Sequence, residues 1–120
     1  MAIAANSPVT FQFARQGGAD IQCQVQVWHK KDKYSPADRP IKLINFTNPL
    51  VVHEAESLQL PKGPYVCVLI GIAREALNGI YNAQLDIEGV KAFQKNGDAN
   101  SSSKPNDIVN LRADIEMVVS

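Results

Sequence analysis

The sequence has few of the residue types that usually reveal a function. Its 120 residues include two cysteines, two histidines and one tryptophan. Cys23 and Cys67 lie in apolar patterns without CxxC spacing, which gives no support to a zinc or thioredoxin-like site. We expect both thiols to be reduced core residues, although a bridge between them is geometrically possible if their strands face each other across a core.

An excess of either charge is also missing, since twelve basic residues balance twelve acidic ones. Nucleic-acid binding normally depends on a basic face, and the basic cluster at residues 29–33 is short and interrupted by Asp32. We therefore expect no nucleic-acid partner. A net charge of zero also makes self-association easier, so a homo-oligomer is expected.

Segments typical of membrane proteins or secreted precursors are not seen either. No apolar run approaches the roughly 20 residues of a membrane-spanning helix, so no membrane span is expected. Residues 1–13 lack the charged and apolar regions of a secretory signal. The location stays open between the cytoplasm, by default, and export by a non-classical route.

What the sequence does contain is a strong β-strand pattern. The longest apolar stretch, residues 58–73, passes from a turn containing Pro61 and Gly63 into a run that is apolar on both faces. Such a run is typical of a central strand that is covered on both sides. Residues 21–28 form the clearest period-two segment. Its inner row is predicted to be Ile21, Cys23, Val25 and Val27.

Turn residues separate the other predicted strands, and no amphipathic helix of ordinary length is indicated. These strands are expected at residues 9–15, 41–46, 50–52, 81–87, 90–95 and 109–119, with a break at 54–57 and one helical turn at 74–77. The pattern predicts one domain, residues 1–120. Its fold class is an all-β antiparallel sandwich of about seven to eight strands, with immunoglobulin-like or jelly-roll-like topology. The alternative is a small β-barrel.

One short motif within residues 58–67 carries a family resemblance. The pattern Leu58-x-Leu60-Pro61-x-Gly63-x-Tyr65-x-Cys67 resembles the start of the tyrosine-corner strand in immunoglobulin-like and fibronectin-type sandwiches. This resemblance implies that the Tyr65 hydroxyl bonds back to the preceding connection. The chain departs from those families because about three further strands follow. Trp28 also has the opposite parity to Cys23, so it is not the tryptophan that packs on an inter-sheet disulfide.

No catalytic constellation is recognised, and we expect a protein that is not an enzyme. The segment His53–Ser57 begins like the HExxH metalloprotease motif but has Ser57 in place of the second histidine. An enzyme using surface carboxylates is the least favoured hypothesis, because the carboxylates available for it lie on outward rows. They are Asp86, Glu88, Asp114 and Glu116.

A low-complexity segment, residues 96–106, is interpreted as a flexible polar loop. It and its flanks carry oxygen-bearing side chains that are weak candidates for Ca²⁺ ligands: Asp98, Asn100, Asn106 and Asp107. The alternating acidic spacing of an EF-hand is missing, so a plain loop without a cofactor is the favoured interpretation.

The most informative surface feature is the second row of residues 21–28, which we call the Gln–Trp row. It consists of Gln22, Gln24, Gln26 and Trp28. Amides supply donors and acceptors, and an indole can stack on a sugar or fill a partner's pocket. The row therefore predicts a carbohydrate-binding face or a subunit interface with Trp28 as its anchor. Alternatively, residues 31–39 of the same chain cover Trp28.

The sequence thus predicts a non-enzymatic binding or assembly module. It would self-associate and present a neutral polar–aromatic face to a protein or glycan partner in a lectin-like manner. The alternative is a structural subunit of a larger particle or secretion assembly, in which the strand edges and the Gln–Trp row are buried between subunits.

Overall fold

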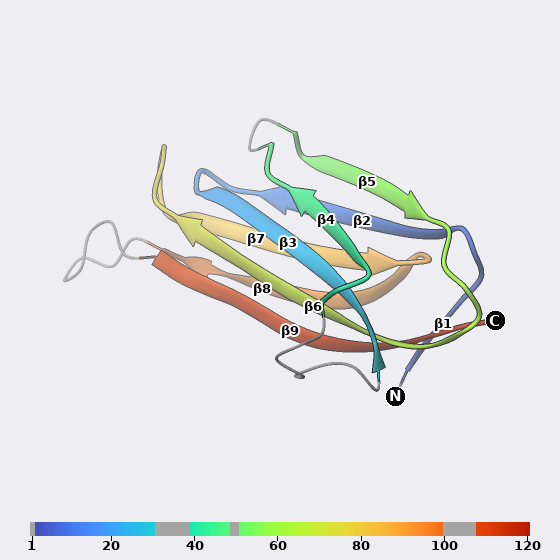
Figure 1. Ribbon diagram of the computed structural model, residues 1–120. Helices are drawn as coiled ribbons and strands as arrows, with labels where there is room; N and C mark the ends of the chain where they lie inside the picture. The colour runs from blue at the N-terminus through green and yellow to red at the C-terminus, as the bar shows by residue number, and fades with distance from the viewer. Residues whose placement is uncertain (1, 31–38, 49–50, 100–107) are drawn as a thin grey trace.

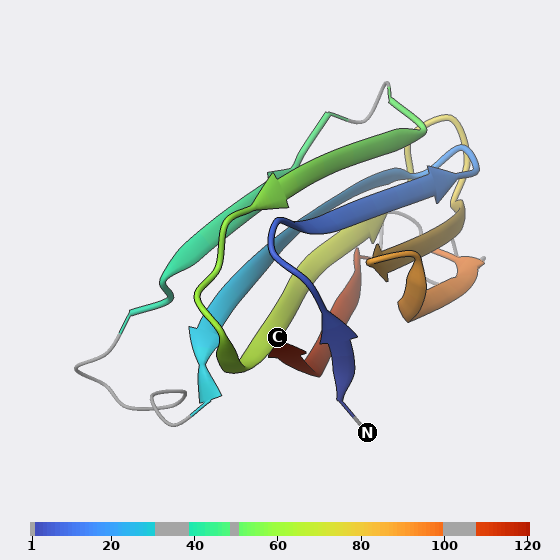
Figure 2. The same cartoon turned by 90° about the vertical axis from the view of Figure 1, so that its right-hand side faces the viewer.

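A computed structural model describes residues 2–30, 39–48, 51–99 and 108–120. Nine strands and no helix are found in this part of the chain (Figures 1 and 2). The strands form two sheets, of five and four strands, that pack face to face without closing into a barrel. The predicted all-β sandwich is therefore confirmed, with one strand more than the largest expected number.

The five-stranded sheet contains the central strand that the longest apolar stretch predicts. Its order is β1-β9-β6-β3-β4, and every neighbouring pair is antiparallel except β1 and β9, which run parallel. The strands are β1 (Ile3–Ala5), β3 (Asp20–His29), β4 (Lys42–Phe46), β6 (Gly63–Arg74) and β9 (Ile108–Val119).

The four-stranded sheet has the order β5-β2-β7-β8, and all of its pairs are antiparallel. Its strands are β2 (Val9–Gln16), β5 (His53–Leu58), β7 (Ile80–Ile87) and β8 (Val90–Asp98). Strands β7 and β8 are joined at Glu88 and Gly89, which have φ angles of 52° and 75°. Two successive positive φ values are the signature of a type I′ turn, which joins the two strands in a tight hairpin.

The core lies between the inner rows of the two sheets, as strand alternation predicts. One apolar row of each of β2, β3, β7 and β9 faces this core, and the row of β3 is the one predicted from the sequence. Its largest fully buried side chains are Tyr65, Phe11, Phe13, Phe46, Ile21, Ile44, Leu69, Leu85, Ile87, Leu111 and Met117. The rings of Phe13 and Phe46 stack with their centroids 5.5 Å apart, joining one sheet to the other.

Strand β6 lies in the middle of the five-stranded sheet, between β3 and β9. Its start forms the corner that the family resemblance implies, since the Tyr65 hydroxyl donates a hydrogen bond to the Pro61 carbonyl. Burial raises the pKa of Tyr65, which favours the protonated hydroxyl needed for this bond. The corner fixes the connection that carries the chain from β5 in one sheet to β6 in the other.

A buried arginine ties the two sheets together at the end where β4 crosses to β5. Arg15 is 5% exposed and points inward from β2. Its guanidinium donates hydrogen bonds to the carbonyls of Asn48 and Phe46 and pairs with the carboxylate of Glu54. It also lies 5.0 Å from the centroid of the Phe13 ring. One side chain thus bonds to carbonyls at and just after the end of β4 and to the Glu54 carboxylate near the start of β5.

Three local predictions are wrong, and each concerns an edge or a turn. Residues 54–57, expected to be a break, belong to β5, an edge strand that pairs only with β2. Most β5 side chains are exposed, so it has little apolar alternation to reveal it. Of the strand predicted at 50–52, Val51 and Val52 are not in a strand and residue 50 lies outside the described residues. Of residues 74–77, Arg74 ends β6 and residues 76–77 form a bend, so the expected helical turn is not found, and β1 was not anticipated.

The two cysteines occupy the same sheet, so a bridge across the core is ruled out. On neighbouring strands β3 and β6, Cys67 lies opposite Val27 and Cys23 lies opposite Gly71. This offset of four positions corresponds to roughly 13 Å along the strands, well beyond the ~7 Å limit between Cα atoms of bridged cysteines. Both thiols are free and buried, and burial raises the pKa of each to about 12.

Candidate functional site: two outer sheet faces

The Gln–Trp row lies on the outer face of the five-stranded sheet, as its alternation predicts. All four residues are half-buried and belong to β3, between β4 and β6. Residues 31–38, most of the segment considered as a cover for Trp28, lie outside the described residues. In the sheet, the row borders β4 on one side and the central strand β6 on the other.

The amides of this row bond to one another and form a ladder along β3. Trp28 Nε1 donates to Gln26 Oε1 at 3.2 Å, and Gln26 Nε2 donates to Gln24 Oε1 at 3.1 Å. Gln24 Nε2 continues the ladder to Asn45 Oδ1 on β4, at 3.0 Å. Gln22 Nε2 separately donates to the Asp20 carboxylate. Every side chain of the row that made it a candidate sugar site thus has a hydrogen-bond partner within the chain.

Beside the row, the outer side of β6 is apolar over residues 66–72. These apolar side chains lie directly opposite the Gln–Trp row and opposite polar residues of β9. Val66 and Val68 are 8% and 3% exposed, whereas Ile70 is 39% exposed. Leu43, which lies opposite Gln26 on β4, is 50% exposed. The central apolar row is thus covered by its neighbours at one end and open at the other.

The charged side chains on this outer face are paired as well. Lys30 Nζ lies 3.0 Å from Glu116 Oε1 and Arg74 lies 3.2 Å from the Asp20 carboxylate. Arg112 and Asp114 are 3.8 Å apart on the same strand. The hydrogen bond from Lys30 lowers the pKa of the Glu116 carboxyl. Amides and charges on the five-stranded face are therefore largely satisfied within the molecule.

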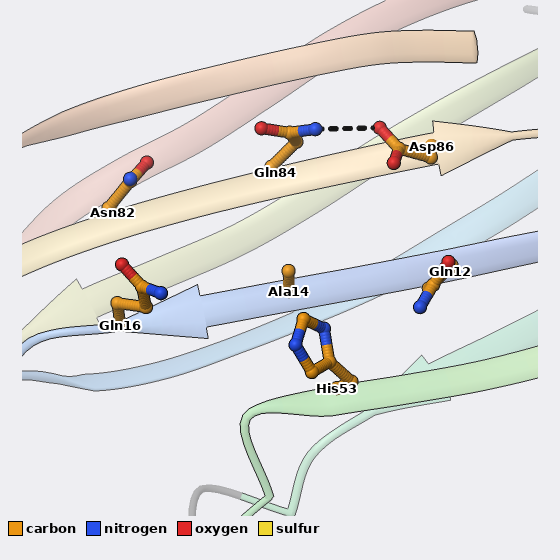
Figure 3. Close-up of a pocket in the computed structure, with 7 residues that line it drawn as sticks. All are labelled: Gln12, Ala14, Gln16, His53, Asn82, Gln84 and Asp86. Atoms are coloured by element: carbon orange, nitrogen blue, oxygen red, sulfur yellow. Dashed lines mark hydrogen bonds between the residues drawn. The ribbon is translucent and has the colours of Figure 1, made fainter. Parts of the chain in front are cut away.

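The outer face of the four-stranded sheet has a different character, because it contains a shallow hollow of about 270 Å³. Ala14 of β2 forms its floor and lies directly opposite His53 of β5 and Gln84 of β7. Longer polar side chains surround this small residue (Figure 3). The full lining is Gln12, Ala14, Gln16, His53, Asn82, Gln84 and Asp86, and we call it the Ala14 hollow.

Several polar groups at the Ala14 hollow have no partner within the described chain. Gln84 Nε2 donates to Asp86 Oδ1 at 2.9 Å, and Asn82 Oδ1 accepts a bond from Gln94 at 3.3 Å. The side chains of Gln12, Gln16 and His53 make no hydrogen bond to another described residue. The sequence alone does not reveal this site, because its residues come from three strands that are far apart in the chain.

The other candidate residues are scattered. Residues 96–98, interpreted as the start of a flexible loop, belong to β8, which ends at Asp98, and residues 100–106 of that segment lie outside the described residues. Asn100, Asn106 and Asp107 lie there too, so the Ca²⁺ hypothesis is untested. Within the part of the chain that is described, no group of three or more His, Cys, Asp or Glu side chains could hold a metal ion. Carboxylates named above divide between the sheets: Asp86 on β7, Glu88 in the β7–β8 turn, and Asp114 and Glu116 on β9.

The two histidines are also separated. His29 of β3 stacks on Tyr65 with ring centroids 5.2 Å apart, and His53 begins β5 in the other sheet. Among the residues that the structure describes, no helix has the length and apolar character needed to span a membrane. No family model, curated protein or solved structure that was compared with the chain matches it.

Proposed function

We propose that this protein is a non-enzymatic assembly module that self-associates through the outer face of its five-stranded sheet. The observation that carries the proposal is the pairing of polar groups on that face, beside exposed apolar side chains. The side chains of Ile70 and Leu43 are exposed to solvent, while the amides of the ladder and the charged groups beside it already have partners within the chain.

Pairing of this kind lowers the cost of covering the face with protein. A polar group buried without a partner costs about 1–3 kcal/mol, whereas a group that enters an interface already bonded avoids most of that penalty. Exposed Ile70 and Leu43, with the half-buried Trp28, then supply apolar area for the contact. Trp28 is the natural anchor, because tryptophan is enriched among the residues that dominate binding energy.

A second copy of the same chain is the occupant that we favour. The zero net charge means that two copies do not repel each other as a whole. The exposed side chains of Ile70 and Leu43 can pack against the same side chains of a second copy when a two-fold axis brings the two faces together. A glycan on the Gln–Trp row would instead have to compete with the bonds of the ladder for the same amides.

The sandwich itself we infer to be an elaborated immunoglobulin-like arrangement. In support, β3, β6 and β9 lie side by side in the order of the C, F and G strands, and Tyr65 makes the corner bond at the start of β6. The β7–β8 hairpin would then be an insertion between the last two of these strands, and it extends the opposite sheet beyond β2.

Sedimentation velocity across a range of protein concentrations tests the proposed self-association. The wild-type chain should reach twice its 13.1 kDa mass. Ile70→Asp should weaken the association at least about tenfold, because it places a charge in the apolar contact. The matched control is Ile80→Asp, since Ile80 is 55% exposed on the other sheet and its replacement should leave the association unchanged.

The same measurement separates the closed dimer from the alternative function. A structural subunit of a larger particle should grow beyond two copies as the concentration rises, through the free edges of β1, β4, β5 or β8. A monomer at every concentration, or equal effects of the two aspartate variants, would contradict the proposed interface. Circular dichroism spectra should confirm that both variants retain the fold.

A further inference from the structure

The Ala14 hollow is produced by a difference in side-chain size between neighbouring positions. On the outer side of β2, Ala14 stands between Gln12 and Gln16, and its cross-strand neighbours are His53 and Gln84. Strands lie about 4.8 Å apart, and alternate residues of one strand are about 6.8 Å apart. Longer polar side chains therefore surround the space above the Ala14 methyl, both along β2 and across the sheet (Figure 3).

This ring offers both donors and acceptors to a ligand. Gln12 and Gln16 contribute whole amides, because neither is bonded to another described side chain. Gln84 Oε1 and one Asp86 oxygen remain as acceptors beyond the bond that joins these two residues. A sugar hydroxyl both donates and accepts, so pairs of neighbouring hydroxyls match such a mixed set of groups.

The charge of the hollow argues against other small ligands. Among the described residues, no lysine or arginine lines it, so an anion finds no fixed positive charge. The described lining contains one carboxylate, Asp86, which is too few for the oxygen cage that Ca²⁺ requires. Apolar ligands find little more than the Ala14 methyl and the His53 ring, whereas a sugar can use both against its C–H groups while its hydroxyls bond to the amides.

We propose that the Ala14 hollow is a binding site for one ring of a neutral saccharide. Its volume of about 270 Å³ is just below the roughly 300–1,000 Å³ of pockets for drug-sized ligands, which suits a single ring. The site lies on the sheet opposite the Gln–Trp row, so it goes beyond the proposed self-association and can be present or missing independently of it.

Nuclear magnetic resonance on ¹⁵N-labelled protein tests this site directly. The probes are the methyl glycosides of glucose, galactose, mannose, N-acetylglucosamine, fucose and xylose, with sodium sulfate as an anion control. At least one glycoside should shift the backbone amides of Ala14, His53 and Gln84, with a dissociation constant on the order of 1 mM, as expected for a small ligand in an open site. Trp28 fluorescence should not change.

Two variants link the shifts to the hollow. Ala14→Leu fills the gap from an outward-facing position and should abolish the shifts, while Ala55→Leu, an exposed substitution on β5 outside the lining, should retain them. Gln12→Ala should weaken binding about fivefold through one lost hydrogen bond. The proposal is overturned if no glycoside shifts these amides, if sulfate shifts them instead, or if the shifts survive Ala14→Leu.

Discussion

The two outer faces of the sandwich are both rich in neutral amides, but the glutamines of β3 are bonded within the chain and those of β2 are not. On β3, Gln24, Gln26 and Trp28 follow one another at alternate positions and bond along the strand into a ladder. On β2, Ala14 separates Gln12 from Gln16, which places these two positions roughly 13 Å apart along the strand, too far for their amides to meet. The spacing of the glutamines along the strand, rather than their number, decides whether their amides bond to one another or remain available to a ligand.

This difference divides the proposed roles between the faces. A face with paired polar groups and exposed Ile70 and Leu43 is suited to a second protein surface, because little desolvation remains uncompensated. A hollow with unpaired amides is suited to a hydroxyl-bearing ligand that can satisfy them.

The largest mutational effect is expected in the interior that both faces share. Arg15→Met removes the donors to the Asn48 and Phe46 carbonyls and leaves Glu54 without its partner. Breaking a buried ion pair costs about 3–5 kcal/mol, and the partly exposed Glu54 places the expected loss in the free energy of unfolding near 3 kcal/mol. Chemical denaturation at a fixed protein concentration measures this loss.

Glu54→Gln provides the matched control for Arg15→Met, because the amide oxygen still accepts a bond from the guanidinium. Its effect should be clearly smaller. A loss below about 1 kcal/mol for Arg15→Met, comparable to an ordinary surface substitution, would show that the ion pair does not hold the β4–β5 crossover.

A glutamine-to-alanine substitution on each face should have a smaller effect on stability, and the size of that effect should differ between the two faces. Gln26→Ala removes the middle of the ladder, so Trp28 Nε1 loses its acceptor and Gln24 Oε1 loses its donor. We expect it to lower the free energy of unfolding by about 1 kcal/mol. Gln12→Ala breaks no bond to a described residue, so its effect should stay within about 0.5 kcal/mol of zero.

Paired thermal or chemical denaturation of these two alanine variants is the appropriate measurement, again at one protein concentration. Equal effects would remove the distinction between a bonded and an unbonded amide row. A larger loss for Gln12→Ala would reverse it.

Sequence alternation was sufficient to predict the strands that have one apolar row and one polar row. The inner row of β3 and the apolar character of both sides of β6 follow from the pleat, because successive side chains point to opposite faces. Edge strands gave a weaker signal. In β5, Glu54 faces Arg15 instead of an apolar side chain, so the strand reads as a polar break.

The candidate sites were predictable to different degrees for the same reason. All residues of the Gln–Trp row lie within one strand, so alternation alone identified the surface on which they gather. The Ala14 hollow requires knowing that β5 and β7 flank β2, and this order depends on pairing between segments about 40 and 70 residues apart. Local periodicity does not contain that information.

We propose above all that the outer face of the five-stranded sheet binds a second copy of the chain. A dilution series followed by ¹H–¹⁵N correlation spectra tests it most directly. Amide signals of β3 and β6 near Gln24 and Ile70 should shift as the protein is diluted, while those around Ala14 on β2 stay in place. Shifts confined to the neighbourhood of Ala14, or spectra that do not change while the protein remains a monomer, would contradict the claim.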